Sequence, residues 1–141
     1  MSSSCGFALP RARVPTLTLH PKPRTGEKTD PSSFTNPAAT GVMMATTWGD
    51  PTKGPFGAFN KFVAGFTAPL HTHSANTRIV VISGTMAMTG EDGKEMKFPP
   101  GSFYTQPNTL PHVTKCLQGA DCLCYLEADG KWDLKPVEAK K

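Results

Sequence analysis

Short apolar or β-branched segments, separated at close intervals by glycine and proline, make up most of the sequence from Gly41 onward and constrain the fold most. The 141 residues include 14 prolines and 13 glycines, and no stretch longer than a few residues has helical periodicity. Strands that recur between turn signals in this way are typical of an all-β sandwich or barrel. The length suits one domain with one sizeable core. We therefore predict a single all-β domain with little helix.

The predicted strands lie between clear turn signals, and the N-terminal segment differs from them in composition. We expect strands at 42–48, 56–63, 78–82, 85–89, 102–106, 112–116 and 122–127. Residues 1–37 are rich in Ser, Pro, Thr and Lys, which predicts a loose leader that is partly disordered or adds one edge strand. The predicted division is a leader over 1–37, a barrel domain over 38–135 and a charged tail over 136–141.

The charge distribution argues against a nucleic-acid or membrane partner. The formal net charge is +4, but the basic residues alternate with acidic ones and no basic stripe carries interleaved aromatic residues. No apolar run approaches the roughly 20 residues of a membrane span, and residues 1–10 lack the apolar core of a signal peptide. We expect a soluble, cytoplasmic protein, or a periplasmic one if a leader precedes this sequence.

The four cysteines are too few to form a disulfide scaffold in a chain of this size, and none forms a Cys-x-x-Cys pair. Cys116 and Cys122 flank a predicted hairpin turn. They could form a disulfide across two strands under oxidising conditions, or they could lie as buried thiols. The sequence leaves both alternatives open.

Three of the four histidines fall in two short segments. His71 and His73 are two residues apart, so their side chains point to the same face of an extended strand. His112 begins a later strand and adds a third imidazole if the two strands are neighbours in a closed barrel. Three neutral imidazoles would leave the charge of a bound ion available to water or substrate. A His-x-His pair also occurs on surfaces and in cores without a metal.

Glycines and prolines frame these histidines in a pattern that resembles the two motifs of the cupin superfamily. Residues 65–73, which contain the His-x-His pair and are followed by Gly84, look like the first motif, and residues 101–112 look like the second. The segments 48–56 and 129–133 resemble those of small bacterial cupins related to the anti-sigma-factor type. The resemblance implies a single-domain, RmlC-like jelly-roll β-barrel.

The resemblance also implies one divalent metal ion, held by His71, His73 and His112. Three imidazoles do not choose among iron, zinc, manganese, nickel and copper. Where cupins usually carry a metal-binding Glu, this chain has Thr77, whose neutral hydroxyl is a poor ligand, so we expect three histidines and waters. The usual second-motif Gly is replaced by Thr109, and the usual terminal Asn by Cys116.

Strand alternation predicts which residues line the interior with the histidines. Inward positions are Thr77, Ile79, Val81, Tyr104, Gln106, Thr114 and Cys116, whereas Arg78 points outward. The predicted pocket is mostly apolar and holds no carboxylate, which suits a small organic molecule. Tyr104 and Gln106 are candidates for assisting a metal-bound water, although Tyr104 could be a wall aromatic only. The sulfur side chains of Met43, Met44, Met86 and Met88 are expected to fill the core.

Several functions are compatible with this pattern. One is a metal-dependent enzyme, an oxygenase (including a dioxygenase), lyase or isomerase that acts on a small organic substrate. Another is a non-catalytic binding or sensory module, which the missing carboxylate favours. A third is a cupin that holds no metal. Apolar residues on both phases of 78–82 predict a homodimer, because they require cover on both faces of the strand.

Overall fold

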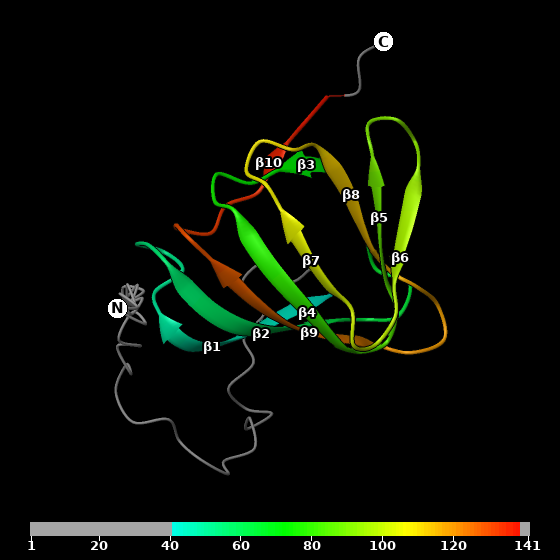
Figure 1. Ribbon diagram of the computed structural model, residues 1–141, viewed down its shortest axis with the longest axis horizontal. Coiled ribbons are helices and arrows are strands. Elements are labelled where there is room, and N and C mark those ends of the chain that lie inside the picture. Colours follow the sequence, from blue (N-terminus) through cyan, green and yellow to red (C-terminus); the bar gives the residue numbers. More distant parts are fainter. Residues whose placement is uncertain (1–40, 139–141) are drawn as a thin grey trace, which may run out of the picture.

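Two antiparallel sheets of five strands face one another across the core in the computed structural model, which describes residues 41–138 (Figure 1). The first sheet has the strand order β1-β2-β9-β4-β7, and the second has the order β10-β3-β8-β5-β6. The strands are β1 (Val42–Gly49), β2 (Phe56–Phe62), β3 (Thr67–Thr72), β4 (Thr77–Ser83), β5 (Met86–Gly90), β6 (Glu95–Phe98), β7 (Phe103–Gln106), β8 (His112–Cys116), β9 (Cys122–Ala128) and β10 (Lys135–Pro136). No helix occurs within residues 41–138, so the predicted all-β jelly roll is confirmed.

Seven of these strands were predicted with their bounds, β3 was expected only as an extended strand around His71 and His73, and β6 and β10 were not predicted. Pro69 interrupts the strand pattern of β3 and coincides with a register shift between Ala68 and His71. β6 is mostly exposed, and β10 spans two residues, so neither has a clear apolar alternation. The predicted leader over 1–37 lies outside the described residues, and the division of the chain stays a prediction.

The inner face of the first sheet is organised in rows that run across its strands. The row that we call the near row consists of Phe56, Ala128, Thr77 and Gln106, which are consecutive cross-strand partners. The middle row consists of Ala58, Leu126, Ile79 and Tyr104. The far row consists of Met44, Asn60, Cys124 and Val81. Strand alternation directs these rows toward the second sheet, and most of their residues belong to the buried core.

Glycines with positive φ occupy the framing positions of the two cupin-like motifs. Gly65, Gly84 and Gly101 have φ values of +79°, +73° and +86°, a region that favours glycine because it lacks a Cβ. Thr109, which stands where the second motif usually has glycine, also has a positive φ of +62°. It is the single non-glycine residue with positive φ among residues 41–138. The backbone of the motif is therefore kept although its side chain has changed.

A disulfide between Cys116 and Cys122 connects the end of β8 to the start of β9, with the two Cα atoms 5.9 Å apart. Because β8 and β9 belong to different sheets, the bond links the two sheets at one end of the sandwich. Of the two alternatives that the sequence left open, the structure has the disulfide. Cys124 is a buried free thiol.

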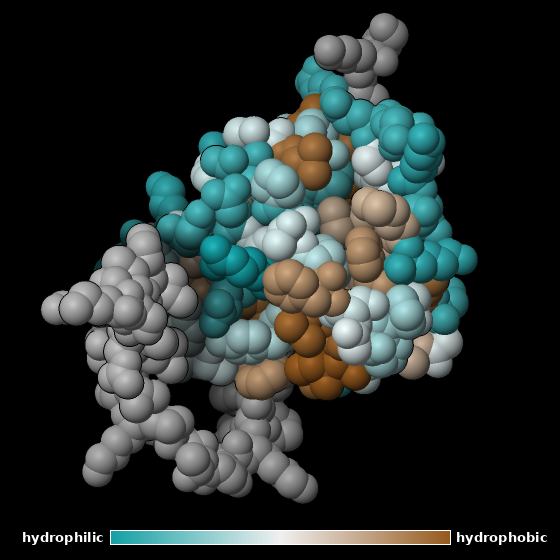
Figure 2. Space-filling view, in the orientation of Figure 1, coloured by the Kyte–Doolittle hydropathy of each residue, from teal (hydrophilic) through white to brown (hydrophobic). Residues whose placement is uncertain are grey.

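The outer face of the first sheet carries apolar residues. Figure 2 shows apolar side chains gathered over the region where β4 and β7 lie in Figure 1, and the exposed apolar residues of these strands are Val80, Ile82 and Phe103. The predicted alternation along β4 is thus present, because Ile79 and Val81 are buried on the opposite face. Among residues 41–138 we find no helix with the length and apolar character of a membrane span.

Candidate metal centre

Three histidines from the second sheet converge in the interior. His71 lies in β3, His73 follows the end of β3, and His112 begins β8, where it is the cross-strand partner of His71. All three are at most 6% exposed. One ring nitrogen of each lies within 4.8 Å of the corresponding atom of the other two. This spacing allows all three imidazoles to bind one ion.

Hydrogen bonds to backbone carbonyls orient each imidazole. The Nδ1 atom of His71 lies 2.6 Å from the Pro69 carbonyl oxygen, and the Nδ1 atom of His112 lies 2.8 Å from the Leu110 carbonyl oxygen. Because a carbonyl can only accept, each Nδ1 carries the proton and donates it. The unprotonated Nε2 of each ring is then the atom available to a metal.

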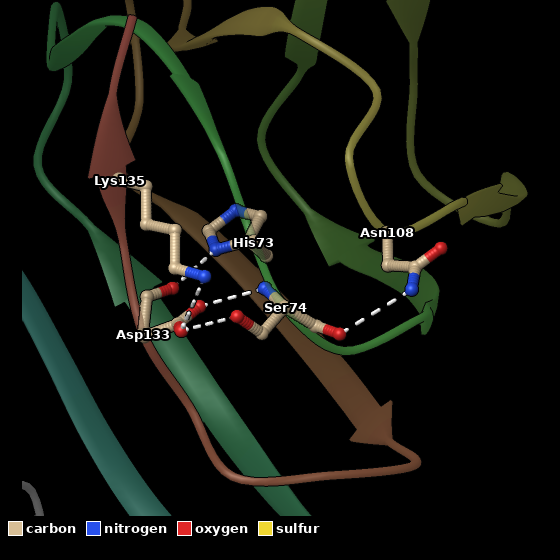
Figure 3. A network of polar contacts seen from close by, with 5 residues as sticks. All are labelled: His73, Ser74, Asn108, Asp133 and Lys135. Atoms are coloured by element: carbon tan, nitrogen blue, oxygen red, sulfur yellow. Dashed lines mark hydrogen bonds and ion pairs between the residues drawn. The ribbon is translucent and has the colours of Figure 1, made fainter.

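The third ring, His73, is held by the segment that leads into β10 (Figure 3). Its Nδ1 donates to the backbone carbonyl of Asp133 at 2.6 Å. The Asp133 carboxylate accepts hydrogen bonds from the backbone N–H and the hydroxyl of Ser74, at 2.7 and 2.6 Å, and pairs with Lys135 at 3.7 Å. The loop after β3 and the segment before β10 are thus tied together at His73 and Ser74, which fixes the imidazole ring.

The electrostatics of the three rings suit a cation. Burial lowers the pKa of His71 and His73 and lowers the pKa of His112 to about 4, so all three are neutral near pH 7. The Nε2 atom of His112 is buried and has no hydrogen-bond partner among the described residues. This atom is thus a buried acceptor without a proton donor, and the other two histidines each bring a ring nitrogen within 4.8 Å of a ring nitrogen of His112. The His71, His73 and His112 cluster could therefore hold a divalent metal ion.

Trp132 packs directly against this cluster. Its ring stacks on His73 with the ring centroids 4.4 Å apart and 27° between the planes. Phe56 in turn contacts Trp132 in a T-shaped arrangement, with the centroids 6.1 Å apart. These contacts place the near row of the first sheet beside the histidines.

Thr77, at the position of the usual cupin Glu, is buried and bonded to a neutral partner. Its hydroxyl donates to Oε1 of Gln106 at 3.1 Å, and Nε2 of Gln106 contacts the Met88 sulfur at 3.4 Å. A hydrogen-bonded neutral pair, Thr77 and Gln106, therefore takes the place of the carboxylate. Among residues 41–138, the three histidines are the potential metal ligands that lie close enough together to hold one ion.

A cavity of about 330 Å³ adjoins the histidines and runs between the two sheets. His71 and His73 lie in its wall together with residues of the middle and far rows, including Asn60, Ile79, Tyr104 and Cys124. The lining is mainly apolar and contains no carboxylate among the described residues. A cavity of this size and composition suits a small, mainly apolar organic molecule.

The structure places the residues expected from strand alternation as follows. Ile79, Tyr104, Gln106 and Thr114 line the cavity, whereas Thr77, Val81 and Cys116 are buried in the core beside it. Arg78 is exposed on the outer face, as predicted. Met86 and Met88 are buried core residues, and Met44 lines the cavity.

Sequence reasoning missed three residues of this region: Asn60, Trp132 and Asp133. Asn60 has a signal in the sequence, because it shares the phase of Phe56, Ala58 and Phe62 on a strand whose inner face is otherwise apolar. Trp132 and Asp133 belong to a loop, for which periodicity gives no direction.

Comparison with known proteins gives a family and a fold. A family model described as "Domain of unknown function (DUF4437)" matches residues 36–141. The comparison with curated proteins found no significant match.

Solved structures with similar folds include the polyketide cyclase RemF from Streptomyces resistomycificus, at 17% identity and a TM-score of 0.64, covering 82% of this chain and 87% of that one. An RmlC-like cupin protein from Ralstonia eutropha JMP134 is similar at 17% identity and a TM-score of 0.61, covering 80% of this chain and 76% of that one. A chain of the Rhodobacter sphaeroides complex of SigE with the anti-sigma ChrR is similar at 20% identity and a TM-score of 0.55, covering 68% of this chain and 48% of that one. These likenesses confirm the cupin fold predicted from the two motifs.

Proposed function

Because the chain belongs to the family described as "Domain of unknown function (DUF4437)" and has the cupin fold, we propose that it is a metal-dependent enzyme for a small organic substrate. His71, His73 and His112 hold one divalent ion, and the adjoining cavity binds the substrate. The observation that carries this proposal is the convergence of three buried imidazoles, each with its Nδ1 atom committed to a backbone carbonyl.

The groups around the site define what chemistry the chain itself can perform. A divalent ion on three neutral imidazoles supplies a Lewis acid with positions open to substrate and water. The wall of the cavity is mainly apolar, and the Thr77–Gln106 pair supplies neutral polar groups at this end of the first sheet. Burial raises the pKa of Tyr104 and raises the pKa of the Cys124 thiol to about 12, so neither is ionised near pH 7.

Among oxygenases, lyases and isomerases, the site is most compatible with an oxygenase that uses iron. A lyase or an isomerase commonly needs a positioned base, and no carboxylate lies in the described wall of the cavity. An oxygenase reaction can proceed without one, because dioxygen accepts the electrons of the substrate. The similarity of the fold to a polyketide cyclase, RemF, supports the broader class of enzymes on small organic molecules.

Oxygen consumption tests this proposal. The protein is loaded with iron(II) and mixed with a panel of small apolar alcohols, phenols and diketones, and oxygen uptake is recorded with an electrode. We expect uptake with at least one substrate class and no uptake by the His112→Ala variant under the same conditions. Full iron occupancy without uptake across the panel contradicts the oxygenase assignment.

A non-catalytic binding or sensory module is the second candidate. The cavity without a carboxylate favours it, and one protein of similar fold, the anti-sigma ChrR, is found in a complex with its partner SigE. In that case a ligand binds at the metal and leaves unchanged. Recovery of unmodified ligand after prolonged incubation with the metal-loaded protein supports this alternative, whereas product formation rules it out.

We further propose that the chain forms a homodimer through the outer face of the first sheet. Val80, Ile82 and Phe103 are between 39% and 62% exposed there, and Val80 and Phe103 are cross-strand partners, so the apolar side chains lie side by side. Light scattering is expected to give twice the monomer mass for the native protein and a monomer for Ile82→Asp. A monomeric native protein contradicts this proposal.

A further inference from the structure

The cavity extends well beyond the histidines along the first sheet. Phe56 of the near row is connected to His73 through Trp132, and Asn60 of the far row lies four residues further along β2. At roughly 3.3 Å per strand residue, Phe56 and Asn60 are about 13 Å apart along β2. His73, Trp132 and Asn60 all lie in the cavity wall, so a ligand that reaches both the histidines and Asn60 follows the cavity along the first sheet.

Asn60 is a buried polar residue in an apolar setting. It is 2% exposed, it lines the cavity, and its cross-strand partners are Met44 and Cys124. Its Oδ1 atom has no hydrogen-bond partner among the described residues. A buried acceptor without a partner destabilises the folded chain, and an aliphatic residue at this position would avoid that loss. The Oδ1 atom of Asn60 is therefore an acceptor that is open to a donor in the cavity.

The other polar groups of the cavity have different roles. The Oε1 atom of Gln106 accepts the Thr77 hydrogen, so this pair is engaged within the protein. The ring of Tyr104 stacks on Phe98 with the centroids 4.1 Å apart, which fixes its position in the wall. Cys124 beside Asn60 is a neutral thiol. No charged residue lies in the described wall of the cavity, so a neutral donor matches the far end best.

We propose that Asn60 determines ligand specificity: its side-chain oxygen accepts a hydrogen bond from a neutral hydroxyl group at the far end of an elongated, apolar ligand. The other end of that ligand carries an oxygen function, such as a carboxylate or carbonyl, that reaches the three histidines. This specificity rests on the proposed binding of a small molecule at the metal. The ligand class is that of ω-hydroxylated or para-hydroxylated apolar acids and ketones.

Binding of matched probe pairs to the metal-loaded protein tests this inference. The pairs are cinnamate with 4-hydroxycinnamate, hexanoate with 6-hydroxyhexanoate, and octanoate with 8-hydroxyoctanoate, and calorimetry gives each Kd. We expect the hydroxylated member of at least one pair to bind at least tenfold more tightly. In the Asn60→Leu variant the same pair should bind with equal Kd, and the variant should be at least as thermally stable as the native protein.

The control is Lys61→Gln, the next residue of β2, which is half-exposed on the outer face. This variant should keep the native preference. Equal Kd values within every pair, no binding in any pair, or an unchanged preference in Asn60→Leu would overturn the inference. The native protein alone decides the first two outcomes, even if the variant fails to fold. Loss of metal from the native protein is a separate outcome, which contradicts the proposed function itself.

Discussion

The indole of Trp132 lies stacked on the imidazole of His73, 4.4 Å between ring centroids and 27° between ring planes. Because His73 is one of the three converging histidines, Trp132 is placed to report on an open-shell ion that binds them. Copper(II) or nickel(II) bound to His73 is expected to quench the fluorescence of the stacked indole.

Metal titration followed by tryptophan emission is therefore the first test. The chain has two tryptophans, so Trp48→Phe leaves Trp132 as the remaining emitter. We expect emission to fall by more than half at one equivalent of copper(II) in the native protein and in Trp48→Phe. Trp132→Leu should lose this response. A titration that leaves the emission of Trp48→Phe unchanged would contradict binding beside His73.

Asp133 is expected to raise metal affinity although its carboxylate is not a ligand. Its side chain fixes Ser74, and its backbone carbonyl accepts the His73 Nδ1 hydrogen, so the carboxylate holds the ring in place through the loop. We predict that Asp133→Ala weakens metal binding about 10- to 100-fold, as is common when the groups that orient a ligand are lost. Asp92→Ala, which removes a similar turn contact to Lys94 in the β5–β6 loop, should leave the affinity unchanged.

The same carboxylate makes stability depend on pH. Hydrogen bonds from Ser74 hold the pKa of Asp133 below its ordinary value, so the folded pKa is lower than the unfolded one. The stabilisation of the folded chain by the Asp133 carboxylate is therefore fully present above its unfolded pKa, about 4, and is lost as the pH falls through its folded pKa. In urea unfolding of the metal-free protein, the difference between native and Asp133→Asn free energies should shrink between pH 7 and pH 3. A difference that stays constant over this range would show that the carboxylate makes no such contribution.

Thr109 gives a prediction in the opposite direction, a gain of stability. A β-branched residue with φ of +62° is strained, and the left-handed region costs roughly 1–2 kcal/mol for a residue with a Cβ. Thr109 also donates its backbone N–H to the His73 carbonyl at 3.0 Å, and glycine keeps that bond. Removing this strain is offset in part by the entropy that glycine adds to the unfolded chain, roughly 0.4–1 kcal/mol. We therefore expect Thr109→Gly to raise the free energy of unfolding by a net amount of up to about 1 kcal/mol. A fall in stability would contradict the strain.

The disulfide between Cys116 and Cys122 should stabilise the folded chain modestly. The two residues are six apart in sequence, and closing so short a loop is worth roughly 2 kcal/mol in the chain-entropy model. We expect the double variant Cys116→Ala, Cys122→Ala to unfold at lower urea concentration than the native protein, and the gap to narrow in the presence of a reductant. Equal unfolding midpoints without reductant would contradict a stabilising bond.

The sequence predicted the barrel and the convergence of the histidines because both depend on local patterns. Alternation along strands placed His71, Ile79 and Gln106 on the inner face, and the framing glycines marked the turns between them. Trp132 and Asp133 could not be found in this way, because they act from a loop whose path depends on tertiary contacts with Ser74 and His73. β10 was missed for a related reason: two residues carry no period, and its pairing with β3 follows from the fold.

Metal content of the purified protein tests the central claim most directly. Elemental analysis after reconstitution should give close to one divalent ion per chain for the native protein and for His20→Ala, a control outside the described residues. His71→Ala, His73→Ala and His112→Ala should each hold much less metal while their circular dichroism stays that of a β-sheet protein. Unchanged metal content in these three variants, or none in the reconstituted native protein, would contradict a metal centre built from the three histidines.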